Sequence, residues 1–309
     1  MNVYETVTSQ MIAKLSEGTV PWRKPWQAAF DAPRNLDGRL YRGINVWTLL
    51  SACAPSPIWM TYRQATDRGG HVLKGEHGLP AIFYKVGSGT GEDEDGNPVT
   101  RKRFILQYFT LFNLSQTEGV KVPAKTLAAV TPVERQIDPI NAAEAIIDGM
   151  PDAPAIIWGG GRAFYRQSLD EAHIPPRTSF DGPAELYSTV FHELGHSTGH
   201  AKRLGRPGIT DTLHSFGDAM YSREELVAEM VSAFLCGEAG ISPDVLDNQA
   251  AYVGNWIAAL RADSRALVIA AGQAQKAADL ILARMPAVAV TPTIESDGVT
   301  VDVGLDIAA

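Results

Sequence analysis

The stretch "STVFHELGHSTGH", residues Ser188–His200, carries three histidines and one glutamate on a segment with the apolar spacing of a helix. Because residues four apart share one face of a helix, His192 and His196 can bind one metal ion from the same side. Glu193 lies one position round the helix, where it can take a proton from a water that the metal activates. This is the HExxH pattern, which predicts Glu193 as the catalytic residue and one divalent ion, Zn²⁺, as cofactor.

A catalytic zinc site needs a third protein ligand, and the sequence offers three candidates. His200 continues the four-residue series, but it lies about 12 Å along a straight helix from the first histidine, so we interpret it as a helix-end residue. Glu225 follows Ser222 in the S-x-x-E pattern of a capping box, which gives this acid a structural reason. Glu229 lies among apolar residues, where an acid needs a partner. We therefore prefer Glu229 as the third ligand and keep Glu225 as a supporting neighbour or substitute.

Charge is distributed unequally along the 309 residues, whose net charge is −8. Residues 1–130 carry 15 Lys and Arg against 11 Asp and Glu, whereas residues 131–309 carry 12 against 24. A basic half beside an acidic half indicates a polyanion as the partner of the basic half.

The N-terminal part also interleaves cations with aromatic rings, in "PWRKPW" and "GRLYRGINVW". Most aromatic residues there are expected to form a core, but this pattern suits a single strand, since cations follow phosphates while bases stack on rings. No zinc finger or RNP motif is visible, so sequence-specific reading of duplex DNA is not favoured. The candidate residues for binding single-stranded DNA are Trp22, Arg23, Lys24, Trp26, Arg39, Tyr41 and Arg42.

The order of apolar patterns predicts an α+β protein, with a mixed α/β N-terminal domain over 1–130, a second domain over 131–285 and a flexible tail over 286–309. The acidic, glycine-rich segment 87–98 is expected to be a mobile hairpin loop. Strands are expected at 58–63, 80–86, 103–114, 154–160 and 162–175. Helices are expected at 2–16, 141–150, 183–199, 222–240, 248–263 and 264–285.

Other classes of protein are disfavoured by what the sequence lacks. It has no apolar run of about 18 residues and no signal-peptide pattern, so we expect no membrane partner and a cytoplasmic location. Its two cysteines, Cys53 and Cys236, lie far apart and outside any CxxC pair, which argues against a disulfide framework or a cysteine zinc site.

Eight ordered motifs carry a resemblance to a known family: "PWRKPW", "RLYRGIN", "WMTYRQA", "GGHVLKGEHG", "FNLSQTEG", "HELGHSTGH", "EELVAEMVSAFLC" and "AAYVGNWIAAL". Together they resemble the ArdC-type antirestriction proteins of conjugative plasmids, over roughly residues 4–284. The N-terminal part is also similar to that of TraC-type plasmid primases.

The resemblance implies an N-terminal domain that binds single-stranded DNA, a C-terminal zincin-like metallopeptidase domain, and protection of incoming plasmid DNA from host restriction. It implies that His192 and His196 bind the metal, that Glu193 is the catalytic acid and that Glu229 is the third ligand. Two classes of function remain open. The protein shelters single-stranded DNA, or it is an active metalloprotease that cleaves a host protein and uses DNA only for targeting.

Overall fold

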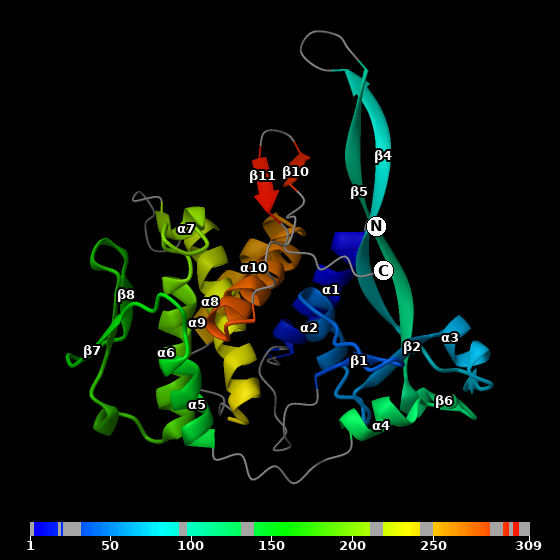
Figure 1. Cartoon of the computed structure of the whole chain (residues 1–309), viewed down its shortest axis with the longest axis horizontal. Coiled ribbons are helices and arrows are strands. Elements are labelled where there is room, and N and C mark those ends of the chain that lie inside the picture. Colours follow the sequence, from blue (N-terminus) through cyan, green and yellow to red (C-terminus); the bar gives the residue numbers. More distant parts are fainter. Residues whose placement is uncertain are drawn as a thin grey trace.

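The computed structural model describes residues 3–17, 20, 32–92, 98–130, 139–210, 219–241, 250–284, 293–296 and 299–302. Figure 1 shows a helical part beside a part built around strands, from which one long hairpin projects. This mixed architecture confirms the expected α+β class.

The N-terminal part is built around a four-stranded sheet in the order β1-β2-β5-β4, in which β1 and β2 are parallel and the other pairs are antiparallel. A second, two-stranded sheet pairs β3 with β6. The elements of this part are α1 (Val3–Ser16), β1 (Arg34–Asn35), α2 (Ile44–Leu50), β2 (Ile58–Thr61), α3 (Tyr62–Asp67), β3 (His71–Val72), β4 (Leu79–Glu92), β5 (Pro98–Asn113), β6 (Thr117–Glu118) and α4 (Ala124–Val130).

Strand β2 ends earlier than the sequence predicts, because Thr61 starts a helix. Its hydroxyl accepts a hydrogen bond from the Gln64 backbone N–H, and the Gln64 side chain accepts one from the Thr61 backbone N–H. This reciprocal capping box satisfies two backbone donors and turns the expected strand end into α3.

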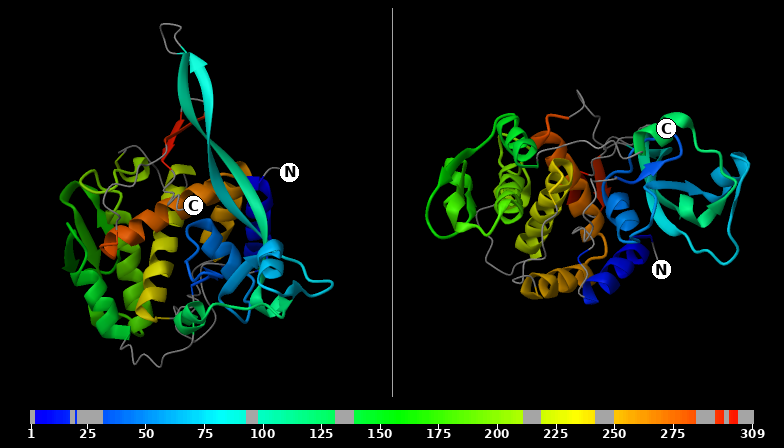
Figure 2. Two further views of the ribbon diagram at one scale, coloured as in Figure 1. Left: turned by 45° about the vertical axis from the view of Figure 1, so that its right-hand side comes forward. Right: turned by 90° about the horizontal axis from the view of Figure 1, so that it is seen from below.

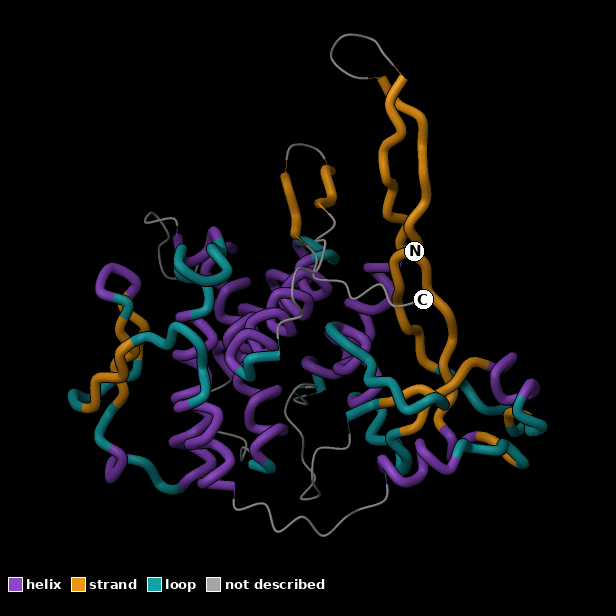
Figure 3. Tube along the Cα trace, in the orientation of Figure 1, coloured by secondary structure: helices purple, strands orange, loops and turns teal. Residues whose placement is uncertain are grey.

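The hairpin of β4 and β5 is longer than expected. The two strands pair in register from Leu79 opposite Leu111 to Glu92 opposite Pro98, so residues 87–92 of the expected loop over 87–98 form strand. Residues 93–97 of that expected loop lie outside the described residues. Glycine donates and accepts ladder hydrogen bonds as other residues do, so its weak strand preference does not end the pairing. Figures 2 and 3 show this hairpin, here called the β4–β5 arm, extending away from the body.

The C-terminal part combines a three-stranded sheet in the order β7-β9-β8 with packed helices. The expected strand at 162–175 is split in two, because Asp170 takes a left-handed conformation after a 3₁₀ turn. The elements are α5 (Pro139–Asp148), β7 (Ala155–Trp158), β8 (Phe164–Arg166), β9 (Glu171–Ile174), α6 (Pro183–Ser197), α7 (Pro207–Thr210), α8 (Ala219–Ala239), α9 (Ala250–Ala262), α10 (Ala266–Ile281), β10 (Thr293–Ser296) and β11 (Val299–Asp302).

The largest buried cluster includes residues of both parts, from α1 and α2 as well as α5, α6, α8, α9 and α10. Trp47 of α2 packs its ring 4.4 Å from that of Phe234 on α8, measured between centroids. The predicted boundary near residue 130 adjoins 131–138, which are outside the described residues. The shared core means that the sheet-bearing part and the helix α8 support each other.

Of the flexible tail expected over 286–309, only 293–296 and 299–302 are among the described residues, and they form the antiparallel hairpin of β10 and β11. Across the described part of the chain, no helix has both the length and the apolar character needed to cross a membrane.

Candidate metal centre

Helices α6 and α8 approach each other closely at a glycine. A Cβ atom added to Gly195 would lie 3.1 Å from Ala228 Cα and 3.2 Å from Val231 Cβ, so a larger residue would push the helices apart. Helix α6 begins with Pro183 at its first turn, where the missing N–H costs no hydrogen bond. The close packing brings the HExxH motif of α6 against the acidic face of α8.

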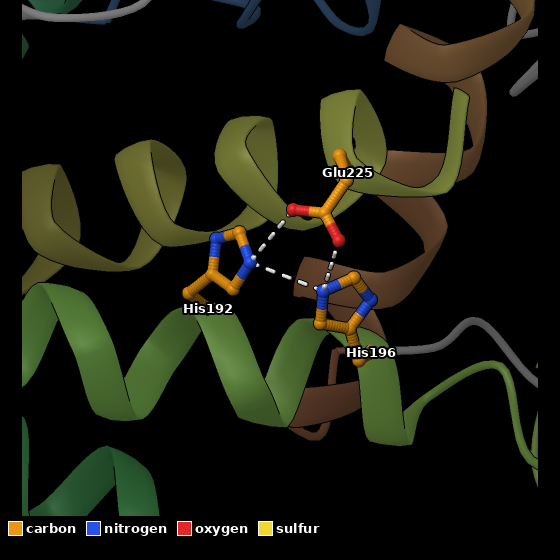
Figure 4. Close-up of side chains that lie close together, drawn as sticks. All are labelled: His192, His196 and Glu225. Atoms are coloured by element: carbon orange, nitrogen blue, oxygen red, sulfur yellow. Dashed lines mark hydrogen bonds and ion pairs between the residues drawn. The ribbon is translucent and has the colours of Figure 1, made fainter. Parts of the chain in front are cut away.

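Three side chains converge between the two helices (Figure 4). His192 Nε2 and His196 Nε2 lie 3.0 Å apart. The two carboxylate oxygens of Glu225 lie 3.4 Å from these nitrogens, Oε2 from His192 and Oε1 from His196. Ligands about 2.0–2.1 Å from one tetrahedral ion lie roughly 3.3 Å from each other. The spacing of these donor atoms therefore fits a divalent ion held by two imidazoles and one carboxylate.

The outer nitrogen of each histidine faces a further carboxylate of α8. His192 Nδ1 lies 3.6 Å from Glu229 Oε1, and His196 Nδ1 lies 3.5 Å from Glu224 Oε1. His196 Nδ1 is buried, and its contact with Glu224 is too long to be a good hydrogen bond, so this nitrogen has no hydrogen-bond partner among the described residues. A histidine that binds metal through Nε2 carries its proton on Nδ1 and directs it to a carboxylate. The orphaned nitrogen thus fits a site that tightens around an ion.

The structure ranks Glu225 and Glu229 as candidates for the third metal ligand in the opposite order from the sequence. Helix α8 begins at Ala219, so Ser222 is within the helix and the expected capping role of Glu225 does not apply. Glu225 instead faces both Nε2 atoms, whereas Glu229 lies one turn further along α8, beside the outer nitrogen of His192. The geometry favours Glu225 as third ligand and Glu229 as the residue that orients His192.

Electrostatics couple the three residues tightly. Burial alone would raise the pKa of Glu225, but its contacts with His192 and His196 hold that pKa well below its usual range. Burial opposes protonation of His192, yet Glu225 raises its pKa above the usual value. For His196, burial is again outweighed, and Glu224 and Glu225 raise the pKa well above the usual value. A metal ion must therefore displace protons to bind.

A buried arginine forms an ion pair with Glu224, the carboxylate that faces the outer nitrogen of His196. Arg206 is 4% exposed and donates from Nε to Glu224 Oε2 at 2.9 Å. It also donates to Thr198 Oγ1 at 2.6 Å and to the Gly195 carbonyl at 2.8 Å. Burial would raise the pKa of Glu224, but Arg206 lowers it. Arg206 and Glu224 were not singled out by the sequence. Glu224 directly precedes Glu225, but no local pattern connects it with an arginine 18 positions upstream.

The remaining residues of the motif are placed as follows. Glu193 is buried on α6, and its charge contributes to the raised pKa of both His192 and His196. His200 lies beyond the end of α6, as expected, and its Nδ1 accepts a hydrogen bond from the Lys202 backbone N–H at 3.2 Å. It is therefore not part of the cluster that includes His192 and His196.

The predicted DNA-binding residues divide into two groups. Arg39 is exposed, Tyr41 is half-buried against the core, and burial raises the pKa of its hydroxyl. Arg42 is ion-paired with Asp279 of α10. The others, which lie outside the described residues, are Trp22, Arg23, Lys24 and Trp26.

Two family models match the chain. Residues 1–112 match the N-terminal domain of anti-restriction factor ArdC, and residues 141–273 match a zincin-like metallopeptidase family. The second match contains α6 and α8, so it includes the whole histidine and glutamate cluster.

Solved structures are similar over nearly the whole chain. The metal-free crystal structure of the antirestriction ArdC protein from the R388 plasmid is 36% identical, with a TM-score of 0.70. The match covers 92% of this chain and 98% of that one. The Mn(II)-bound structure of the same protein matches with a TM-score of 0.69. A divalent metal ion is therefore bound in a protein of the same fold and substantial identity.

Three curated proteins are also similar to this chain in sequence. Two Escherichia coli proteins named DNA primase TraC are 36% and 35% identical over 91% of this chain, which spans only 27% and 20% of their length. The uncharacterized protein y4eC of Sinorhizobium fredii is 33% identical over 90% of this chain and 91% of its own length.

Proposed function

This chain belongs to the ArdC family of antirestriction proteins, and on that premise we propose that it binds single-stranded DNA and protects incoming plasmid DNA from host restriction. One observation carries the proposal. The similarity extends over 98% of the R388 ArdC protein, so both its parts are represented here, and not the metal motif alone. The excess of Lys and Arg in residues 1–130 supports DNA as the partner of the N-terminal part.

The proposed metal ligands are His192, His196 and Glu225. Two imidazoles and one carboxylate suit Zn²⁺, which we propose as the resident ion, while the same donors also accept Mn²⁺. Glu229 and Glu224 orient the rings from their outer nitrogens. Such an ion, when bound, acts as a Lewis acid that polarises a carbonyl and lowers the pKa of water.

A second candidate function, hydrolysis of a peptide bond, is favoured by Glu193. A purely structural zinc site closes its fourth position with another cysteine or histidine and needs no proton acceptor. Here Glu193 is buried beside the two histidines, where it can accept a proton from an attacking water. This carboxylate supports a site that retains hydrolytic capacity.

Plasmid transfer into a restricting host separates the two functions. The first variant carries Glu193→Ala, which removes the proton acceptor and leaves the proposed ligands intact. The second carries alanine at Trp22, Arg23, Lys24 and Trp26. If protection works by covering DNA, Glu193→Ala protects nearly as wild type and the fourfold variant fails. The opposite result would make this chain a protease first.

A control tests whether both variants are folded and contain metal before they are used in the transfer assay. Each is purified, its metal content is measured, and its binding to a labelled oligothymidylate is titrated. Glu193→Ala is expected to keep both metal and DNA affinity, because Glu193 is not a proposed ligand and lies in the acidic half.

A further inference from the structure

The β4–β5 arm has two faces, which the register of its strands separates. Alternate residues of a strand point to opposite faces, and the register pairs odd-numbered residues of β4 with odd-numbered residues of β5. Ala81 is opposite Phe109, and Phe83 is opposite Gln107. The odd-numbered positions of both strands therefore share one face, which we call the odd face.

An aromatic pair lies where the odd face leaves the core. At the base, Ala81 and Leu111 are fully buried in a cluster with Trp59. One step further, Phe83 is 38% exposed, and its ring lies 5.2 Å from that of Phe109, between centroids, at an interplanar angle of 52°. This pair forms a partly exposed aromatic surface whose lower edge is anchored in the core.

The sequence continues this face with arginine opposite glycine. Gly87 is paired with Arg103 and Gly89 with Arg101, at positions of the same parity as Phe83. Phe109 and Arg101 are eight residues apart, or about 27 Å along the strand. Two cationic residues thus occupy register positions of the same parity beyond the aromatic pair.

At the base of the arm, the Asn45 side chain makes the pair of hydrogen bonds that a neighbouring strand would make with Ile82. Asn45 of α2 donates from Nδ2 to the Ile82 carbonyl at 2.8 Å, and its Oδ1 accepts from the Ile82 N–H at 2.8 Å. Ile82 is the neighbour of Phe83, and its own side chain is buried in the main core. The backbone that presents Phe83 is therefore fixed before any ligand binds, which lowers the entropic cost of binding.

We propose that the odd face of the arm binds single-stranded nucleic acid, with a base stacked on the Phe83–Phe109 pair, and that the positive charge which Arg101 and Arg103 add at their register positions contributes to phosphate binding. A ring face suits a base that is free of its own stack, and cations in line with it follow the sugar-phosphate chain. The inference rests on the proposed DNA binding and names the surface that performs it.

The test is a fluorescence-anisotropy titration of the full-length chain with labelled oligothymidylate. Phe83→Leu keeps apolar volume but removes the ring, and it is expected to weaken binding roughly 5- to 150-fold. Phe83→Tyr keeps the ring and is expected to bind as wild type. The double variant Arg101→Ser with Arg103→Ser should reduce the slope of log affinity against log salt by about 1.4, at about 0.7 per phosphate.

Matched controls lie at even-numbered positions of the arm. Tyr108→Leu removes a ring that is 59% exposed, and Lys102→Ser removes one charge. Both are expected to leave affinity and salt slope nearly unchanged. Thermal unfolding of every variant shows whether a loss of binding comes from unfolding instead.

Three outcomes would overturn the inference. If wild type binds and the Phe83→Leu and double-arginine variants bind equally well, the arm is not the surface, while the proposed function stands. If duplex DNA of the same length competes equally, the arm fits a groove and no base stacks on it. If wild type does not bind oligothymidylate at all, the proposed function itself fails.

Discussion

The metal centre and the β4–β5 arm hold their residues in opposite ways. In the metal centre, donor atoms from two helices meet in a buried site, and each imidazole is backed by a second carboxylate of α8. On the arm, Phe83 is partly exposed and lies on a ribbon that extends from the body. In a buried network each residue depends on the others, so removing one residue should abolish metal binding. On an exposed face each contact contributes separately, so the affinity for the ligand should fall in proportion to the contacts removed.

The largest effect is expected from removing a histidine of the metal centre. His192→Ala should abolish stoichiometric metal in the purified protein, because two remaining ligands do not fill a site that needs three. Elemental analysis after gel filtration measures this, with Glu193→Ala as the matched control that keeps its metal. Unchanged metal content in His192→Ala would show that the proposed metal centre is wrong.

The next effect distinguishes the two acids of α8. Glu225→Ala should also lose stoichiometric metal, since Glu225 faces both Nε2 atoms. Glu229→Ala should keep it but bind roughly 10- to 100-fold more weakly, as expected for a residue that orients a ligand. Calorimetric titration with Zn²⁺ measures both. The reverse ranking would make Glu229 the ligand, as the sequence alone suggests.

Breaking the buried ion pair behind the centre should destabilise the protein. Arg206→Met leaves Glu224 charged and buried at 5% exposure, which costs about 3–5 kcal/mol. The double variant with Glu224→Leu removes the orphaned charge and should recover part of that loss. Urea unfolding of the metal-free protein gives both values. A double variant no more stable than Arg206→Met would mean that packing, not charge, explains the loss.

The metal-free and metal-bound forms should respond to pH in opposite directions. The raised pKa of His192 and His196 stabilises the metal-free form below the usual imidazole value of 6.5, and this contribution is lost as pH rises through the folded values. Metal binding strengthens as the same protons leave. The metal-induced increase in Tm should therefore be larger at about pH 8 than at about pH 6. An increase that is equal at both would show that protons and metal do not compete.

The smallest effect is expected from an exposed ion pair of the N-terminal part. Arg68 and Asp37 lie 2.9 Å apart, but both side chains are largely exposed, so Arg68→Gln should cost only about 0–1 kcal/mol. Urea unfolding beside Arg206→Met compares an exposed and a buried ion pair in one molecule. A loss as large as that of Arg206→Met would contradict the distinction between buried and exposed contacts.

Much of the helical part can be predicted from local patterns. Apolar spacing and the HExxH motif predicted a helix over 183–199, and α6 covers Pro183–Ser197. The same spacing placed His192 and His196 on one face, because a helix repeats every 3.6 residues wherever it lies. The ordered motifs also indicated the family. These features depend on residues close in sequence, so the chain alone contains the needed information.

Tertiary structure decided what depends on how elements are placed against each other. Glu225 and Glu229 are one turn apart on α8, about 6 Å along its axis, and only the docking of α8 at Gly195 shows which one faces both Nε2 atoms. The contact of Arg206 with Glu224 joins segments 18 residues apart. The sequence by itself determined which residue types share a helix face. The structure decided which of them meet, because the rotation and shift of one helix against another are set by packing over the whole core.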